Sequence, residues 1–193
     1  MKNAGIGAQG RQIVSGSATF TTNSETQALL AKDGVKFVSA KNSSVKGASV
    51  IVPVSSGSIV VSSFIGSAHG PGSVVFAANG KKVAFTNIVV NTRLRRVSGM
   101  VNGKRTQLYR MSVRNLTHAD LKGGSISGTG ITTTLSKQAA SKLNKELGVT
   151  TFKKGLKMGS ITMVVTTKKG AAPAAKPATP AKSTTTTTTT AGK

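Results

Sequence analysis

Short apolar runs that alternate with polar residues occupy most of the chain between residues 13 and 167. Such alternation puts every second side chain on one face of a strand, and the runs are too short for helices. The pattern therefore predicts a mainly β, antiparallel fold. The predicted strands cover residues 13–22, 35–40, 48–54, 57–64, 73–78, 81–90, 94–101, 104–113, 125–134 and 158–167.

Two Asn-Gly pairs, Asn79-Gly80 and Asn102-Gly103, each stand between two of these apolar runs. Asn-Gly readily takes positive φ at both central positions of a type I′ turn, so each pair is a strong hairpin signal. The two hairpins predict that the four strands between residues 73 and 113 form a meander.

Two segments carry helix signals instead. Residues 24–32 begin at Ser24, the predicted N-cap, and Gly34 follows their end; residues 136–147 have an apolar face and end before Gly148. We predict a short helix in each. Their flanking segments are alike, which fits an internal duplication and two helices with ordinary caps equally well.

The last 26 residues differ in composition from the rest. Residues 168–193 contain Lys, Ala, Pro and a run of seven threonines, and no large apolar residue. Such a segment buries too little surface to offset the entropy of ordering. We predict an N-terminal extension at 1–15, a β domain at 16–167 and a disordered tail at 168–193.

The charge is strongly positive, with 27 Lys+Arg against 4 Asp+Glu and a formal net charge of +23. Five lysines lie in 168–193, so 1–167 retains 22 basic residues and +18. A field of this sign attracts polyanions, which makes an anionic envelope polymer or nucleic acid a candidate partner. The candidate polyanion-binding residues lie in two strand connections: Arg93, Arg95, Arg96, Lys104 and Arg105.

Residue types exclude most other chemistry. Cysteine is absent, and four carboxylates and two histidines are too few for most hydrolase or metal sites. Aromatic residues make up 4% of the chain and none stands in a basic cluster, so base stacking or specific base readout is poorly supported. We predict that the chain is not an enzyme.

Two features bear on location. No apolar run approaches the roughly 20 residues that span a bilayer. The first eleven residues contain no apolar segment typical of a signal peptide. We therefore expect either that the protein is cytoplasmic, or that this sequence begins downstream of the true start.

Two stretches resemble the HtaA-like domain of actinobacterial surface proteins. Residues 72–92 (GSVVFAANGKKVAFTNIVVNT) look like a family element of a glycine, an apolar strand and a β-strand that ends in Asn. Residues 126–148 (ISGTGITTTLSKQAASKLNKELG), followed by 152–162, look like the family's closing segment. The resemblance covers about residues 16–167, and its small, Gly-rich motifs are of modest specificity.

The resemblance implies a noncatalytic β-sandwich-like domain, exported to the cell surface or secreted, that in some members captures haem with a Tyr and a His. His69 stands in the segment GSAHGPGS, which we predict to be a loop between two strands, and it looks like the family histidine. The family tyrosine lies near the domain start, where this sequence has Phe20 as its only aromatic residue. Tyr109, the single tyrosine, is the remaining candidate partner, and we predict weak haem binding at best.

Two hypotheses follow. The first is an exported, noncatalytic HtaA-like domain that binds haem weakly or an envelope polyanion. The alternative is a cytoplasmic basic protein that binds nucleic acid without sequence preference.

Overall fold

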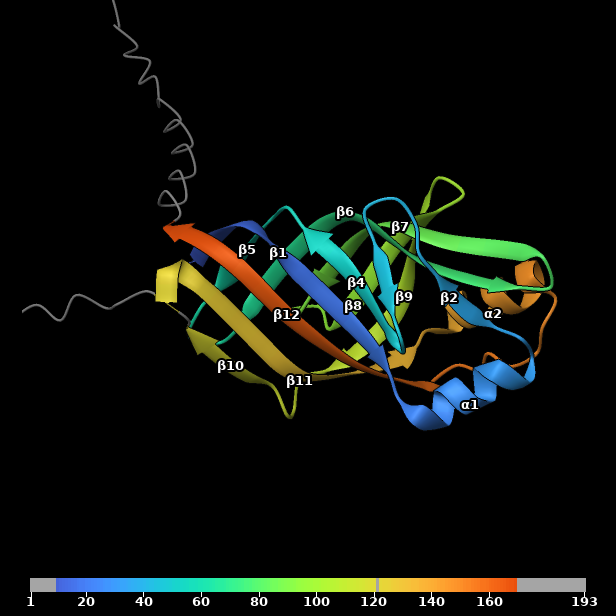
Figure 1. The fold of residues 1–193 in the computed structure, drawn as a ribbon. Coiled ribbons are helices and arrows are strands. Elements are labelled where there is room, and N and C mark those ends of the chain that lie inside the picture. Colours follow the sequence, from blue (N-terminus) through green and yellow to red (C-terminus); the bar gives the residue numbers. More distant parts are fainter. Residues whose placement is uncertain (1–9, 121, 170–193) are drawn as a thin grey trace, which may run out of the picture.

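The computed structural model describes residues 10–120 and 122–169, which form one 12-stranded antiparallel sheet and two α-helices (Figure 1). The strands are β1 (Gly10–Thr22), β2 (Lys36–Val38), β3 (Ser44–Lys46), β4 (Ser49–Val54), β5 (Ser56–Val60), β6 (Ile65–Ala78), β7 (Lys81–Asn91), β8 (Arg96–Val101), β9 (Lys104–Ser112), β10 (Thr117–Asp120), β11 (Ser125–Leu135) and β12 (Lys157–Lys169). The helices are α1 (Ser24–Lys32) and α2 (Lys137–Leu147). The predicted mainly β, antiparallel fold with two short helices is confirmed.

The sheet closes on itself. Strands β6, β7, β8 and β9 pair in order as the predicted meander, and β5 pairs with both β6 and β1. Strand β1 also pairs with β12, β12 with β11, and β11 with β9. The two layers of the sandwich-like domain therefore belong to one continuous sheet, and one set of alternate side chains points into a shared core.

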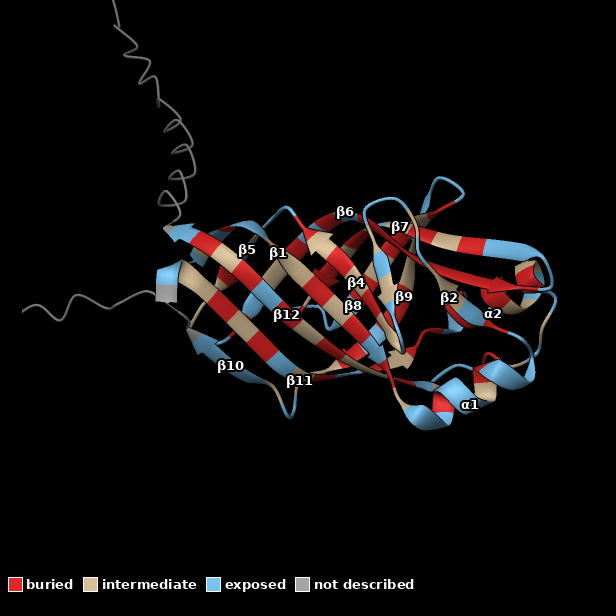
Figure 2. Cartoon of the chain, viewed as in Figure 1, coloured by how far each residue is buried: buried red, intermediate tan, exposed pale blue. Residues whose placement is uncertain are grey.

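Alternation of burial along the strands is visible in Figure 2, where buried and more exposed residues follow one another along β1, β11 and β12. Aromatic rings anchor one part of the core. The ring of Phe76 lies 4.8 Å from that of Phe37, 6.2 Å from Phe85 and 5.7 Å from Phe152. These contacts join β6 to β2, β7 and the segment after α2.

The two helices lie at the same end of the sheet (Figure 1). Helix α2 buries Ala139, Ala140, Leu143 and Leu147 against β6, β7 and β9, so that it covers the core there. The predicted C-terminal stop is confirmed, because Gly148 takes a left-handed conformation with φ 70°.

The predicted N-cap of the first helix is wrong. Asn23, and not Ser24, caps α1: its side-chain oxygen accepts the backbone N–H of Thr26 at 2.7 Å. Asn and Ser are about equally good caps, so adjacent candidates are not separated by residue type. The amide nitrogen of Asn23 favours Asn23 over Ser24 as the cap, because this Nδ2 also donates to the carbonyl of Lys157 at 2.8 Å.

Both predicted Asn-Gly turns are present, with φ of 53° and 71° at Asn79 and Gly80 and 49° and 74° at Asn102 and Gly103. The segment around His69 was predicted to be a loop, and this is wrong, since it is the first half of β6. Its glycines serve close backbone approach: a Cβ at Gly66 would lie 2.0 Å from the carbonyl oxygen of Ser58.

The described sheet begins at Gly10 and ends at Lys169, so it extends beyond 16–167 on both sides. Of the segments predicted as an N-terminal extension and a disordered tail, residues 1–9 and 170–193 lie outside the described residues. Neither described α-helix has the length and apolar character needed to cross a membrane.

Candidate polyanion-binding surface

The connection between β7 and β8, residues 92–95, carries Arg93 and Arg95 and leads directly to Arg96, the first residue of β8. Its first residue, Thr92, is buried and fixes it to the start of β6. The Thr92 hydroxyl donates to the carbonyl of Phe64 at 2.7 Å and accepts the N–H of Gly66 at 2.9 Å. The Thr92 N–H donates to the carbonyl of Gly66 at 3.0 Å. We call residues 92–96 the arginine turn.

Two further contacts hold the arginine turn. The Asn91 side-chain oxygen accepts the N–H of Leu94 at 2.8 Å, which closes a local turn. The carbonyl of Arg95 accepts the N–H of Met111 at 2.9 Å, and Arg95 itself has φ of 51°. The turn is therefore tied to β6 on one side and to β9 on the other.

Four guanidinium groups gather at this turn. Arg93, Arg95 and Arg96 are exposed, and Arg96 lies directly opposite the exposed Arg110 of β9 in the β8–β9 register. No ion pair between described residues involves any of these four side chains. We refer to Arg93, Arg95, Arg96 and Arg110 as the arginine cluster.

Lys104 and Arg105, the other predicted polyanion contacts, lie at the opposite end of β8 and β9, beside the Asn102-Gly103 turn. The Arg105 guanidinium donates to the backbone carbonyl of Asn87 at 2.6 Å, at a register shift in β7. Part of its hydrogen-bonding capacity is thus used within the fold. The structure does not bring these two residues together with the arginine cluster.

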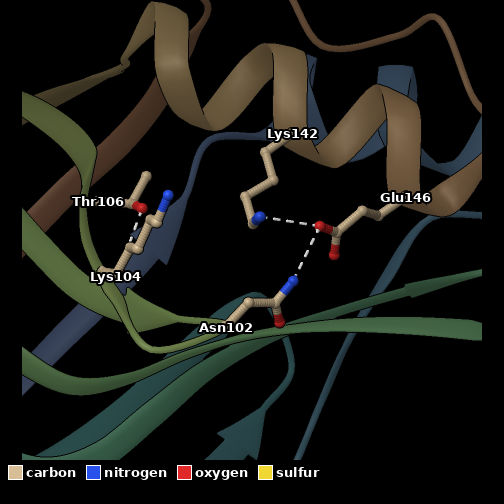
Figure 3. A network of polar contacts seen from close by, with 5 residues as sticks. All are labelled: Asn102, Lys104, Thr106, Lys142 and Glu146. Atoms are coloured by element: carbon tan, nitrogen blue, oxygen red, sulfur yellow. Dashed lines mark hydrogen bonds and ion pairs between the residues drawn. The ribbon is translucent and has the colours of Figure 1, made fainter.

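A carboxylate and the C-terminal end of a helix lie at that opposite end of β8 and β9. Figure 3 shows Glu146 of α2 paired with Lys142 at 2.9 Å and accepting a hydrogen bond from Asn102 at 3.4 Å. Asn79 donates to the carbonyl of Leu147 at 3.0 Å, so both Asn-Gly turns meet the C-terminal end of α2. A helix C-terminus carries partial negative charge and favours nearby cations.

Lysines near that helix end are placed where its partial negative charge favours them. The Lys81 ammonium lies 4.0 Å from the position that a Cβ on Gly148 would occupy, next to the end of α2. Lys36, Lys81 and Lys82 line a cavity of about 420 Å³ nearby. By contrast, the arginine cluster has no ion pair with a described carboxylate.

The two predicted haem ligands occupy different sides of the sheet. His69 is exposed between the buried Ala68 and Gly70 of β6, and its Nε2 lies 3.3 Å from the hydroxyl of Ser67. Tyr109 of β9 is 2% exposed, and its ring lies 5.9 Å from that of Phe20 in the core. Burial raises the pKa of Tyr109 well above its usual value of 10.0.

Sequence reasoning found the three clustered arginines of the turn but missed Arg110. The residues next to Arg110, 106–109 and 111–113, are uncharged, and only the strand register places Arg110 against Arg96. A cross-strand partner of this kind follows from a correct hairpin register, which the bulge between Val97 and Ser98 alters.

Comparison with solved structures identifies the fold. The C-terminal domain of HtaA from Corynebacterium glutamicum superposes with a TM-score of 0.60 at 15% identity, covering 82% of this chain and 99% of that one. This chain has an HtaA-like fold. A domain-swapped dimer of a histidine-to-alanine variant of the same HtaA domain matches with a TM-score of 0.51 at 14% identity, covering 74% of this chain and 90% of that one. No family model and no curated protein matches the sequence.

The HtaA-like fold raises the question of haem, and the candidate ligands do not fit it. An iron ligand from a tyrosine needs an accessible oxygen, whereas Tyr109 is enclosed among core side chains. His69 lies on the outward face of β6, away from that core. The two side chains therefore cannot serve one haem in this arrangement.

Proposed function

We propose that this chain is a noncatalytic, exported domain of the cell envelope that binds an anionic polymer through the arginine cluster. The observation that carries the proposal is the gathering of Arg93, Arg95, Arg96 and Arg110 on a pinned turn and its neighbouring strand. Arginine pairs with phosphate groups through two parallel hydrogen bonds, which suits such a polymer.

Electrostatic strain supports the assignment of a binding role. Like charges directly opposite each other on neighbouring strands are destabilising, and Arg96 faces Arg110 in this way. Lys142 of α2 has an ion pair with Glu146, whereas no ion pair between described residues involves the arginine cluster. A bound anion would relieve the repulsion.

Export is part of the same proposal and rests on the HtaA-like fold, since the HtaA-like domains that the sequence resembles belong to surface proteins. Detection of the protein in the envelope fraction of its cells would support this part. Its confinement to the cytoplasmic fraction would contradict it.

Nucleic acid is the less favoured polymer. All six Phe and the single Tyr lie within the described residues; Phe37 is half-buried and the other six are buried. Proteins that bind single strands stack bases on exposed aromatic rings, and this surface has none to offer. Contact with phosphate groups alone is consistent with a wall polymer.

The salt dependence of binding tests the proposal. Duplex DNA is a suitable probe because each neutralised phosphate contributes a slope of about −0.9 in log affinity against log salt. Five to eight contacts would give a slope on the order of −5 to −7. Replacing Arg93, Arg95 and Arg96 with Gln should reduce its magnitude by about 2.7, three contacts' worth.

A matched control removes the same charge elsewhere. Replacing Lys36, Lys81 and Lys82 with Gln also removes three positive charges, but from the end near α2. We expect this variant to keep most of the wild-type slope. A flat salt dependence of the wild type, or equal losses in the two variants, would contradict a binding role for the arginine turn.

A further inference from the structure

The arginine cluster continues into a row of basic and polar side chains across the outward face of the sheet. Arg96 of β8 lies opposite Arg110 of β9, Arg110 opposite Thr134 of β11, and Thr134 opposite Lys157 of β12. Neighbouring strands lie about 4.8 Å apart, so this cation row extends over about 14 Å. Sequence order gives no hint of it, because its members come from four strands.

A row of hydroxyl groups runs beside the cation row. Its members lie opposite one another, strand by strand, from β4 through β1, β12 and β11 to β9: Ser49, Thr21, Ser160, Thr132 and Ser112. All five are exposed or half-buried. Along β9 and β11 the hydroxyl row is two residues from the cation row, a separation of about 7 Å, and along β12, beside a register shift in β11, it is three residues away.

The two rows border a cavity. It has a volume of about 500 Å³, and its lining includes Thr21, Thr132 and Ser160 from the hydroxyl row with Thr134 and Lys157 from the cation row. The backbone at Lys157 is fixed, because its carbonyl accepts hydrogen bonds from the side chains of Asn23 and Thr26. The Lys157 side chain therefore extends from a fixed backbone position at the border of the cavity.

We infer that the polymer bound by this surface is a phosphate-bearing polyol, with phosphate groups on the cation row and polyol hydroxyls on the hydroxyl row. This inference rests on the proposed function and names its ligand class. Ser and Thr hydroxyls both donate and accept hydrogen bonds, which matches the hydroxyl groups of a polyol. A polymer without hydroxyls, such as inorganic polyphosphate, can use the cation row alone.

The experiment compares two probes of equal phosphate number, poly(glycerol phosphate) and inorganic polyphosphate. In the test variant, Thr132→Val and Ser160→Ala remove two hydroxyls at the cavity with little change in shape. In the control variant, Ser58→Ala and Thr106→Val remove two hydroxyls from β5 and β9 outside both rows. A third variant, Arg110→Gln with Lys157→Gln, removes two cations.

We expect the test variant to bind poly(glycerol phosphate) about tenfold to hundredfold more weakly, because each of the two lost neutral hydrogen bonds weakens binding by about threefold to tenfold. Its affinity for inorganic polyphosphate, and the control variant's affinity for both probes, should stay within error of wild type. The third variant should bind both probes more weakly.

Three results would overturn the inference while leaving the proposed function in place. These are equal wild-type affinity for the two probes, unchanged binding of the polyol probe by the test variant, and tighter binding of DNA than of either probe at equal phosphate number. Absence of binding to every polyanion would instead overturn the proposed function itself.

Discussion

Replacement of Thr92 with Val tests the contacts that hold the arginine turn. The Thr92 hydroxyl donates to the buried carbonyl of Phe64 and accepts the N–H of Gly66. Valine keeps the shape but removes both hydrogen bonds. An unsatisfied buried polar group is unfavourable by about 1–3 kcal/mol, so the loss of both partners should destabilise the fold by about 2–6 kcal/mol.

The conservative control is Thr92→Ser, which keeps the hydroxyl and removes one methyl group. Its expected destabilisation is about 1 kcal/mol, the contribution of one buried methyl group. Urea unfolding of both variants gives the difference directly if the slope of free energy against urea is unchanged. The valine variant should also bind phosphate polymer more weakly, although no arginine has been altered. Equal stability of the Val and Ser variants would refute the reasoning.

Three further changes test other parts of the structure. Hemin titration should show weak haem binding, because Tyr109 is buried on the other side of the sheet from His69. The substitution His69→Ala should abolish this weak binding. Tight haem binding that the substitution leaves unchanged would contradict the positions of these two residues. Because burial raises the pKa of Tyr109, the folded protein holds the phenol proton more tightly than the unfolded chain does. The contribution of Tyr109 to the free energy of unfolding should therefore be constant below pH 10.0 and fall above it. In alkaline unfolding experiments, Tyr109→Phe should make this loss of stability smaller. Gly128→Ala would place a Cβ 2.3 Å from the ring of Phe64 and should destabilise by about 1–3 kcal/mol, with partial recovery on adding Phe64→Leu; a melting temperature equal to wild type would contradict the close packing.

Much of the fold follows from local sequence signals. Alternation found ten of the strands, and the Asn-Gly pairs located two hairpins, because a type I′ turn requires positive φ at both positions. Strands β3 and β10 were missed, since Ser44–Lys46 and Thr117–Asp120 are short and carry few apolar residues. The segment around His69 was predicted as a loop, although its glycines mark close approach of neighbouring backbones.

The candidate surface was less accessible to sequence reasoning. Arg93, Arg95 and Arg96 are close in sequence and were found, whereas Arg110 and Lys157 join them through strand register alone. The pairing of His69 with Tyr109 was a prediction from family resemblance. Which face of a strand each side chain occupies depends on the strand register, and the structure has His69 outside and Tyr109 inside.

Mapping the contact surface by backbone amide NMR tests the central claim most directly. Titration of the labelled protein with a phosphate polymer should shift amides of residues 91–96 and 109–111 first, followed by those around Thr134 and Lys157. Amides at the Asn79-Gly80 and Asn102-Gly103 turns should remain near their free positions. Shifts concentrated at those two turns and at the C-terminal end of α2, with the arginine turn unchanged, would contradict the account.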